Sequence, residues 1–251
     1  MKKYLKRIIL FIIILSTVVC SVLFVENNYL VLSEDNFWRV KNFYKEPRNS
    51  LDVVLMGASE VCSEFSPGLA YEEFGFTSYP FAFDNASVEV WKSQLIEIQK
   101  TQQPELILIE INGALYENDE QLFDDAALRR YTDSIPFSIN KIETLSSCKL
   151  HDDLWSYYIP FIKYRDAIGK NIENYQALES NYREKKYNDS IEQSKLKGFR
   201  TKTFIDSQQS INVNTDKSIS LNNNAEKLLT EFLSYCKENN IRNIVFFSIS
   251  P

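Results

Sequence analysis

Residues 51–60 read LDVVLMGASE, an apolar run that ends in a glycine turn followed by a serine. A short, continuous apolar run of this kind is typical of a strand buried inside a parallel sheet. Gly57 permits a tight turn after that strand, so the hydroxyl of Ser59 is expected at the open edge of the sheet, where backbone N–H groups can stabilise an oxyanion. A serine that only caps the next helix fits the same pattern. The turn also departs from G-x-S-x-G, because Val61 stands in place of the second glycine.

Signals for a helix and a second strand follow this turn. A Ser-Pro pair at 66–67 is a good N-cap and first helical residue, and Gly75 is typical of a helix C-terminus. These signals predict a helix over 67–74. A second strand is predicted over 76–83, where Pro80 favours an edge or an end of the sheet.

The same alternation continues along the chain. Residues 105–111 and 243–249 are continuous apolar runs, which predict two more buried strands. An amphipathic helix is predicted over 222–240, and another helix begins after Asp84 or Asn85. The apolar face of that helix consists of Val88, Trp91, Leu95 and Ile98. Strands that alternate with helices predict an α/β fold with a parallel sheet.

The middle of the chain, at about 114–220, is predicted to be an insertion between two strands of the sheet. Helical patterns occupy 121–131, 139–150 and 153–168. A polar stretch rich in Asn, Ser, Lys and Gln follows them, and it is expected to be loop-like.

The N-terminus carries the clearest membrane signal. An uncharged apolar run of 18 residues, 8–25, follows the basic side chains of Lys2, Lys3, Lys6 and Arg7. This arrangement predicts one transmembrane helix with the basic flank in the cytoplasm and the bulk of the chain outside it. A cleaved signal peptide is the rival interpretation. The residues that end the run are bulky rather than small, so an uncleaved anchor is preferred.

The chain thus divides into three parts. Residues 1–27 form the basic flank and the anchor, residues 28–50 a stalk or lead-in segment, and residues 51–251 the α/β domain with its insertion. Because a covering helix normally follows a parallel strand, the run at 243–249 also leads us to expect that a C-terminal part of the domain is missing.

Composition narrows the possible functions. The formal net charge is −6, with 28 Lys and Arg against 34 Asp and Glu, which argues against nucleic acid as a partner. Cys20 falls inside the N-terminal apolar run, and three cysteines remain for the rest of the chain: Cys62, Cys148 and Cys236. They are widely spaced, so they predict small buried side chains rather than disulfides or a zinc site. A phosphate-binding glycine motif is absent from the sequence, which disfavours a nucleotide-binding protein of the flavodoxin type. No metal and no cofactor are predicted.

The chain contains one histidine, His151. Two aspartates follow it, but it belongs to the predicted insertion, so a surface position is preferred over a catalytic role. Glu60, the immediate neighbour of Ser59, is likewise expected to be structural.

The segment around Ser59 resembles the start of SGNH/GDSL-type hydrolases. The resemblance rests on LMGASE at 55–60, SP at 66–67 and YEEFGFTSY at 71–79, and it continues through QPELILIE at 103–110. It is strongest to the membrane-anchored, cell-surface group of Gram-positive bacteria, which carries Gly-Ser-Ser-His or Gly-Ser-Ser-Glu at this turn. The teichoic acid D-alanyl transfer protein is a relative within that group. The resemblance implies a flavodoxin-like, three-layer α/β/α fold.

The resemblance also implies roles for individual residues. Ser59 matches the family nucleophile. Asn85 and Asn112 match positions after the next two strands that supply oxyanion or substrate contacts, although the order around Asn112 differs from the usual Gly-x-Asn-Asp. The family's Asp-x-x-His motif supplies the base and its orienting carboxylate, and it has no counterpart in residues 1–251.

Two hypotheses for the function follow. In the first, the chain is a surface-anchored esterase or acyltransferase that uses Ser59 on acyl groups of a cell-envelope or capsular polysaccharide or of a teichoic acid. In the second, it is a non-catalytic binding or scaffold protein, or a truncated gene product, in the assembly of such polymers. A serine without an adjacent base is a poor nucleophile, which is the reason for the second hypothesis.

Overall fold

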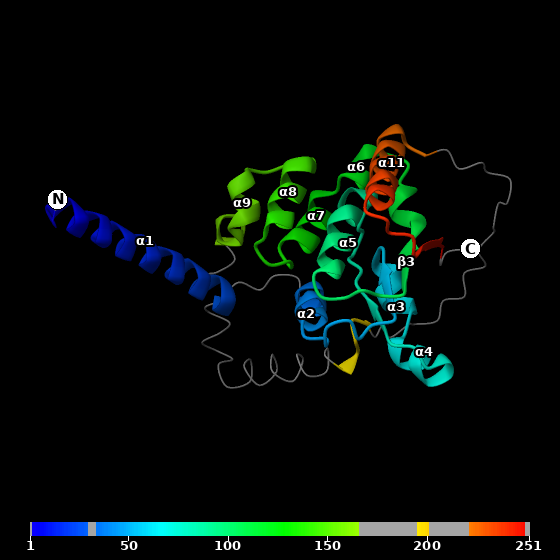
Figure 1. Cartoon of the computed structure of the whole chain (residues 1–251). Helices are drawn as coiled ribbons and strands as arrows, with labels where there is room; N and C mark the ends of the chain where they lie inside the picture. Colours follow the sequence, from blue (N-terminus) through cyan, green and yellow to red (C-terminus); the bar gives the residue numbers. More distant parts are fainter. Residues whose placement is uncertain (1, 30–33, 166–194, 201–220, 249–251) are drawn as a thin grey trace, which may run out of the picture.

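Four parallel strands form the sheet at the centre of the computed structural model, which describes residues 2–29, 34–165, 195–200 and 221–248 (Figure 1). The strand order is β2-β1-β3-β4. The strands are β1 (Val53–Met56), β2 (Ser78–Pro80), β3 (Leu106–Glu110) and β4 (Ile244–Phe247). All pairs are parallel. The α/β class and the parallel sheet predicted from the sequence are confirmed.

Side chains alternate between the two faces of the sheet. Val54 and Met56 of β1 face a large core together with Ile107 and Ile109 of β3. The neighbouring residues of β1 belong to a smaller cluster on the other face, with Val61 and two further buried residues. The large cluster also holds buried side chains of the helices, so one face of the sheet carries most of the hydrophobic core.

The helices nearest to the sheet follow their sequence signals. The helix predicted over 67–74 is α4 (Pro67–Phe74), and the Ser66 hydroxyl accepts from the Leu69 N–H at 3.4 Å. The helix predicted after Asn85 is a short 3-10 turn, η1 (Val88–Val90), continued by α5 (Trp91–Gln99). All four residues of its predicted apolar face are buried. The C-terminal helix is α11 (Asn223–Glu238).

The predicted insertion is mainly helical up to residue 165. It contains α6 (Asp119–Leu122), α7 (Asp125–Thr132), α8 (Ile139–Ser147) and α9 (Leu154–Tyr158). A short 3-10 turn, η2 (Ile111–Ala114), precedes them directly after β3. Most of the polar stretch expected to be loop-like lies outside the described residues.

The lead-in segment predicted for residues 28–50 contains a helix, α2 (Glu34–Phe43). Val40 and Phe43 of this helix are buried in the large core, and the Tyr79 hydroxyl donates to the Arg39 carbonyl at 2.7 Å. Residues 34–43 are therefore part of the packed α/β body.

The last strand differs from its prediction. The apolar run at 243–249 was expected to form a buried strand, but β4 lies at the edge of the sheet. Val245 is 48% exposed and Phe246 is 37% exposed. The prediction of burial was wrong because a continuous apolar run identifies a strand, whereas its burial depends on what packs against it.

The N-terminal helix is long and apolar enough to cross a membrane. Helix α1 (Lys2–Tyr29) contains a segment, Tyr4–Val22, with a mean hydropathy of 2.3, and none of that segment is buried in the protein. A signal sequence would have the same properties. Cys20 lies exposed on this helix, while the other three cysteines are buried, as predicted, and none of the four forms a disulfide.

Candidate functional site

Ser59 lies just after the carboxyl end of β1, which is an inner strand of the sheet. Strand β1 ends at Met56, Gly57 and Ala58 form the turn, and Ser59 begins α3 (Ser59–Glu64). Its side chain is half-buried, and its hydroxyl donates to Glu60 Oε2 at 3.3 Å. The position agrees with the predicted one, at the edge of a parallel sheet where ligand-binding loops gather.

The turn at Gly57 is enclosed by the two neighbouring strands. Gly57 has a φ of 143°, and its carbonyl accepts from the Phe83 N–H at 3.1 Å on the β2 side. On the β3 side the backbone approaches so closely that a Cβ on Gly57 would lie 2.6 Å from Glu110 Cβ. Only glycine fits both the conformation and the space, so the turn that presents Ser59 is fixed from both sides.

The segments that carry Asn85 and Asn112 meet at the same edge of the sheet. A Cβ on Gly113 would lie 2.5 Å from the Ala86 carbonyl oxygen, so the loop after β2 and the turn after β3 are in direct contact. Asn85 is exposed and has a φ of 57°. Asn112 is half-buried, and its N–H donates to Glu110 Oε1 at 2.8 Å. Their roles in holding an oxyanion or a substrate remain predictions.

Glu110 is a residue of this edge whose importance the sequence analysis missed. It is fully buried at the end of β3, and its Oε2 atom has no hydrogen-bond partner. Burial raises the pKa of this carboxyl group, and the nearby carboxylates of Glu60 and Glu64 raise it further. Burial, Glu60 and Glu110 also raise the pKa of Tyr116 to about 12. A charged residue at the end of an apolar strand was the signal for Glu110 in the sequence.

Arg200 brings a positive charge from the insertion to the same edge. Its N–H donates to the Cys62 carbonyl at 2.6 Å, and its Nη1 lies 2.8 Å from Asp84 Oδ1. Its guanidinium also donates to the Ser63 hydroxyl at 3.2 Å, and that hydroxyl donates to the Ser59 carbonyl at 2.9 Å. No local pattern marks this arginine, because its partners are distant in the sequence.

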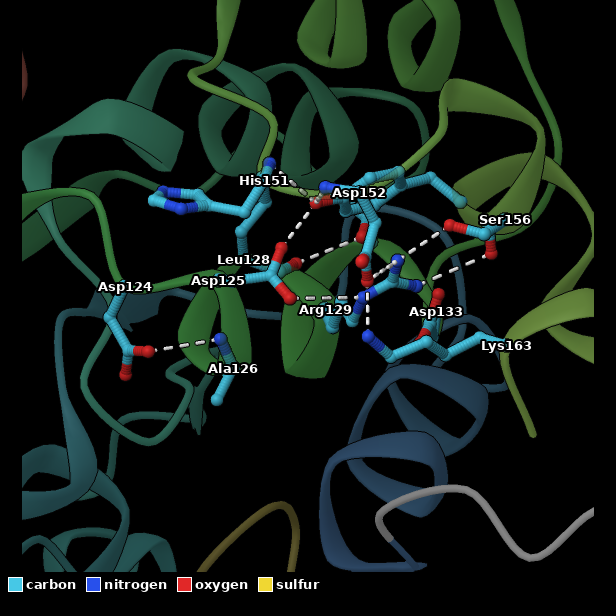
Figure 2. Close-up of polar contacts among 12 residues, drawn as sticks. Asp124, Asp125, Ala126, Leu128, Arg129, Asp133, His151, Asp152, Ser156 and Lys163 are labelled. Carbon is cyan, nitrogen blue, oxygen red and sulfur yellow. Dashed lines mark hydrogen bonds and ion pairs between the residues drawn. The ribbon is translucent and has the colours of Figure 1, made fainter. Parts of the chain in front are cut away.

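His151 lies elsewhere, before α9 and beside α7 (Figure 2). It is exposed, as expected for a surface residue, and its N–H donates to the Tyr157 hydroxyl at 3.2 Å. The sequence contains no second histidine, so within residues 1–251 no other imidazole is available as a base for Ser59. In the part of the chain that the structure describes, no three His, Cys, Asp or Glu side chains are grouped to hold a metal ion.

A cavity of about 470 Å³ lies away from Ser59, between η1, α5, α8 and α11. Its polar wall includes the buried side chains of Ser93, Asn140 and Thr144, and Phe232 contributes to its apolar wall. Glu89 stands at this cavity, where burial raises the pKa of its carboxyl group to about 7, although the N–H and charge of Lys149 oppose the shift.

The raised pKa of Glu89 makes stability depend on pH. Between about pH 4.5 and 7 the folded chain keeps a proton that the unfolded chain releases, so the free energy of unfolding must fall as the pH rises through this range. We expect the wild-type chain to lose about 2 kcal/mol more than Glu89→Gln between pH 4.5 and 8. Urea unfolding of both proteins at the two pH values measures the difference.

Comparing the wild type with Glu89→Gln also controls for the other titrating groups, because both proteins contain them. Asp133, whose carboxyl pKa burial raises to about 6, contributes equally to both proteins. Identical pH profiles for the wild type and Glu89→Gln would contradict the prediction.

The chain was compared with protein-family models, with curated proteins and with solved structures, and none of the three comparisons gave a match.

Proposed function

We propose that the chain is a membrane-anchored SGNH-like esterase or acyltransferase with Ser59 as the nucleophile. Its substrates would be acyl groups of a cell-envelope or capsular polysaccharide or of a teichoic acid. The observation that carries the proposal is the position of Ser59, on a fixed glycine turn at the carboxyl edge of a parallel sheet. Ser59 is half-buried there, so part of the residue is accessible from solvent.

The reaction would proceed through an acyl-enzyme. The Ser59 oxygen attacks the acyl carbonyl, and the polymer hydroxyl leaves with the proton that Ser59 gives up; water or a second hydroxyl then takes the acyl group and returns a proton to Ser59. Asn85 and Asn112, with backbone N–H groups, would stabilise the oxyanion of the tetrahedral intermediate. Arg200 would hold α3 in place through Ser63.

Helix α1 would anchor this site at the membrane. Its apolar segment is long enough to span a bilayer, and the basic residues before it favour a cytoplasmic N-terminus. The α/β body would then lie on the outer side, where cell-envelope polymers are found.

A second candidate function is a non-catalytic binding or scaffold protein for the same polymers. It is favoured by the surroundings of Ser59. The hydroxyl of Ser59 donates to a carboxylate, and buried Glu110 lies close by, whereas the histidine of the chain lies before α9. A carboxylate is a weak base for an alcohol, so this arrangement would bind better than it would activate.

Labelling with a fluorophosphonate probe separates the two candidates. Such a probe reacts covalently with activated serines, so the full chain in membranes should be labelled, and Ser59→Ala should reduce the labelling at least about tenfold. The matched control is Ser66→Ala, because Ser66 is also half-buried and lies immediately before a helix.

Each result has a clear consequence. Equal labelling of wild type and Ser59→Ala would remove Ser59 from the mechanism. A folded wild-type chain that is not labelled would contradict the enzyme and support the scaffold protein.

A further inference from the structure

Helices α8 and α9 present a large exposed apolar surface. Ile139 is 74% exposed, Phe137 is 70% exposed and Trp155 is 62% exposed. We call this surface the α8–α9 patch, and it consists of Phe137, Ile139, Ile142, Leu154, Trp155, Tyr158 and Ile162. A cluster of exposed apolar side chains is typical of a surface that binds a partner or a membrane.

The aromatic part of the patch is contiguous. The ring of Tyr158 lies 6.0 Å from the ring of Phe137 and 6.2 Å from the ring of Trp155, both in edge-on geometry. Tryptophan and tyrosine are the side chains that gather at the boundary between lipid and water, because each has an apolar ring and a polar group. The composition of the patch therefore fits a membrane interface.

A polar network around the buried side chain of Arg129 holds the patch in place (Figure 2). Arg129 of α7 donates to Asp152 at 3.0 Å and to the Ser156 hydroxyl at 2.7 Å, which fixes α9 against α7. Lys163 pairs with the same Asp152. Arg129, Asp152 and Lys163 are thus paired with one another, so an apolar surface can approach these three side chains without leaving an isolated charge in lipid.

The chain length limits how far the patch can lie from the proposed anchor. Only five peptide steps separate Tyr29, the end of α1, from Glu34, the start of α2, and they span at most about 18 Å. The far end of α2 is joined to α8 through one buried carboxylate. Tyr44, directly after α2, and Asn140 of α8 both donate to Glu97. In Figure 1, α8 and α9 lie at one end of the body and α4 lies at the other.

We infer that the α8–α9 patch rests on the lipid bilayer in which α1 is anchored, with the Trp155 ring at the level of the lipid headgroups. The inference rests on the proposed anchoring by α1 and is independent of the chemistry of Ser59. It adds a second membrane contact, which would fix the orientation of the body as well as its distance from the bilayer. The contact is apolar, so it should be insensitive to salt.

The three tryptophans of the chain make the contact measurable. Trp91 is buried and Trp38 is only 9% exposed, so Trp155 is the one that lipid can reach. The full chain would be placed in phosphatidylcholine nanodiscs with or without bromine on the acyl chains, because bromine quenches nearby indole rings. The emission of Trp155 is obtained by subtracting the emission intensity of Trp155→Phe from that of the wild type. Brominated lipid should reduce this difference by about half or more.

The control places a tryptophan on the opposite end of the body. Phe74 of α4 is 72% exposed, so the double variant Trp155→Phe with Phe74→Trp carries a similarly exposed ring outside the patch. We expect brominated lipid to leave the emission of this ring unchanged. Equal quenching at both positions would overturn the inference that the α8–α9 patch faces the bilayer.

The remaining outcomes separate this inference from the anchoring on which it depends. A chain that stays in the disc but shows no quenching of Trp155 would overturn the membrane contact alone. If the Trp155 ring is protected from quenching only in discs that hold two copies of the chain, the patch would be a dimer interface instead. A chain that leaves the disc would overturn the anchoring and the contact together.

Discussion

Replacing Gly57 by alanine is expected to lower the free energy of unfolding by about 3 kcal/mol or more. The backbone of Gly57 has a φ of 143°, which side chains with a Cβ rarely adopt. The added Cβ would also lie 2.6 Å from Glu110 Cβ and 2.9 Å from Val61 Cγ2. Both neighbours are buried in the packed elements that flank the turn, so neither can move away without disturbing the sheet.

A second glycine provides the control for this prediction. Gly75 has a φ of 79°, but an added Cβ there would meet no atom within 4 Å. Gly75→Ala therefore tests the conformation without the collision, and we expect a loss of about 1 kcal/mol. Urea unfolding of the full chain in detergent, followed by near-ultraviolet circular dichroism, measures both variants. Similar losses at the two positions would show that the close contact with Glu110 does not matter.

Glu97→Ala is expected to be the second severe substitution, with a loss of about 3 kcal/mol in the free energy of unfolding. Glu97 is fully buried, and it accepts from Asn140 Nδ2 at 2.6 Å, from Lys100 Nζ at 2.5 Å and from the Tyr44 hydroxyl. Alanine would remove the acceptor of the Tyr44 hydroxyl and the ion pair with Lys100, and it would leave Asn140 Nδ2 with Ser93 as its remaining acceptor. Burial and the neighbouring Glu97 together raise the pKa of Tyr44, so that hydroxyl stays a donor.

The same unfolding experiment tests Glu97 against two other variants. Glu97→Gln keeps an acceptor oxygen and removes only the charge, so it should lose less than alanine. Glu143→Ala, at an exposed position on α8, should change the free energy of unfolding by no more than about 0.5 kcal/mol. A loss at Glu97→Ala as small as at Glu143→Ala would show that the buried carboxylate does not hold α2, α5 and α8 together.

Local signals in the sequence predicted much of this fold correctly. Helix α4 was predicted from its first to its last residue, because Ser66 and Gly75 set its ends through contacts within a few residues. The position of Ser59 after a buried strand and the edge position of Pro80 followed from equally local rules. Helix ends and the positions of turns after strands depend on residues that are near in the sequence, so a sequence pattern predicts them directly.

The features that escaped prediction all depend on distant partners. Helix α2 is a helix of the core because Val40 and Phe43 pack there, yet its surrounding sequence is mixed and polar. Glu110 is one charged residue at the end of a strand, and only the sheet shows that it underlies the Ser59 turn. Arg200 joins Asp84 across 116 positions of the chain, a pairing that no periodicity encodes.

The contact between Arg200 and Asp84 also has a consequence for how the protein folds. It closes a loop of more than a hundred residues, and loops of that length must lose much conformational entropy before their end contacts form. Contacts of such high sequence separation slow folding. The contacts around Ser59 should therefore form last during folding, after the sheet and its helices have already assembled.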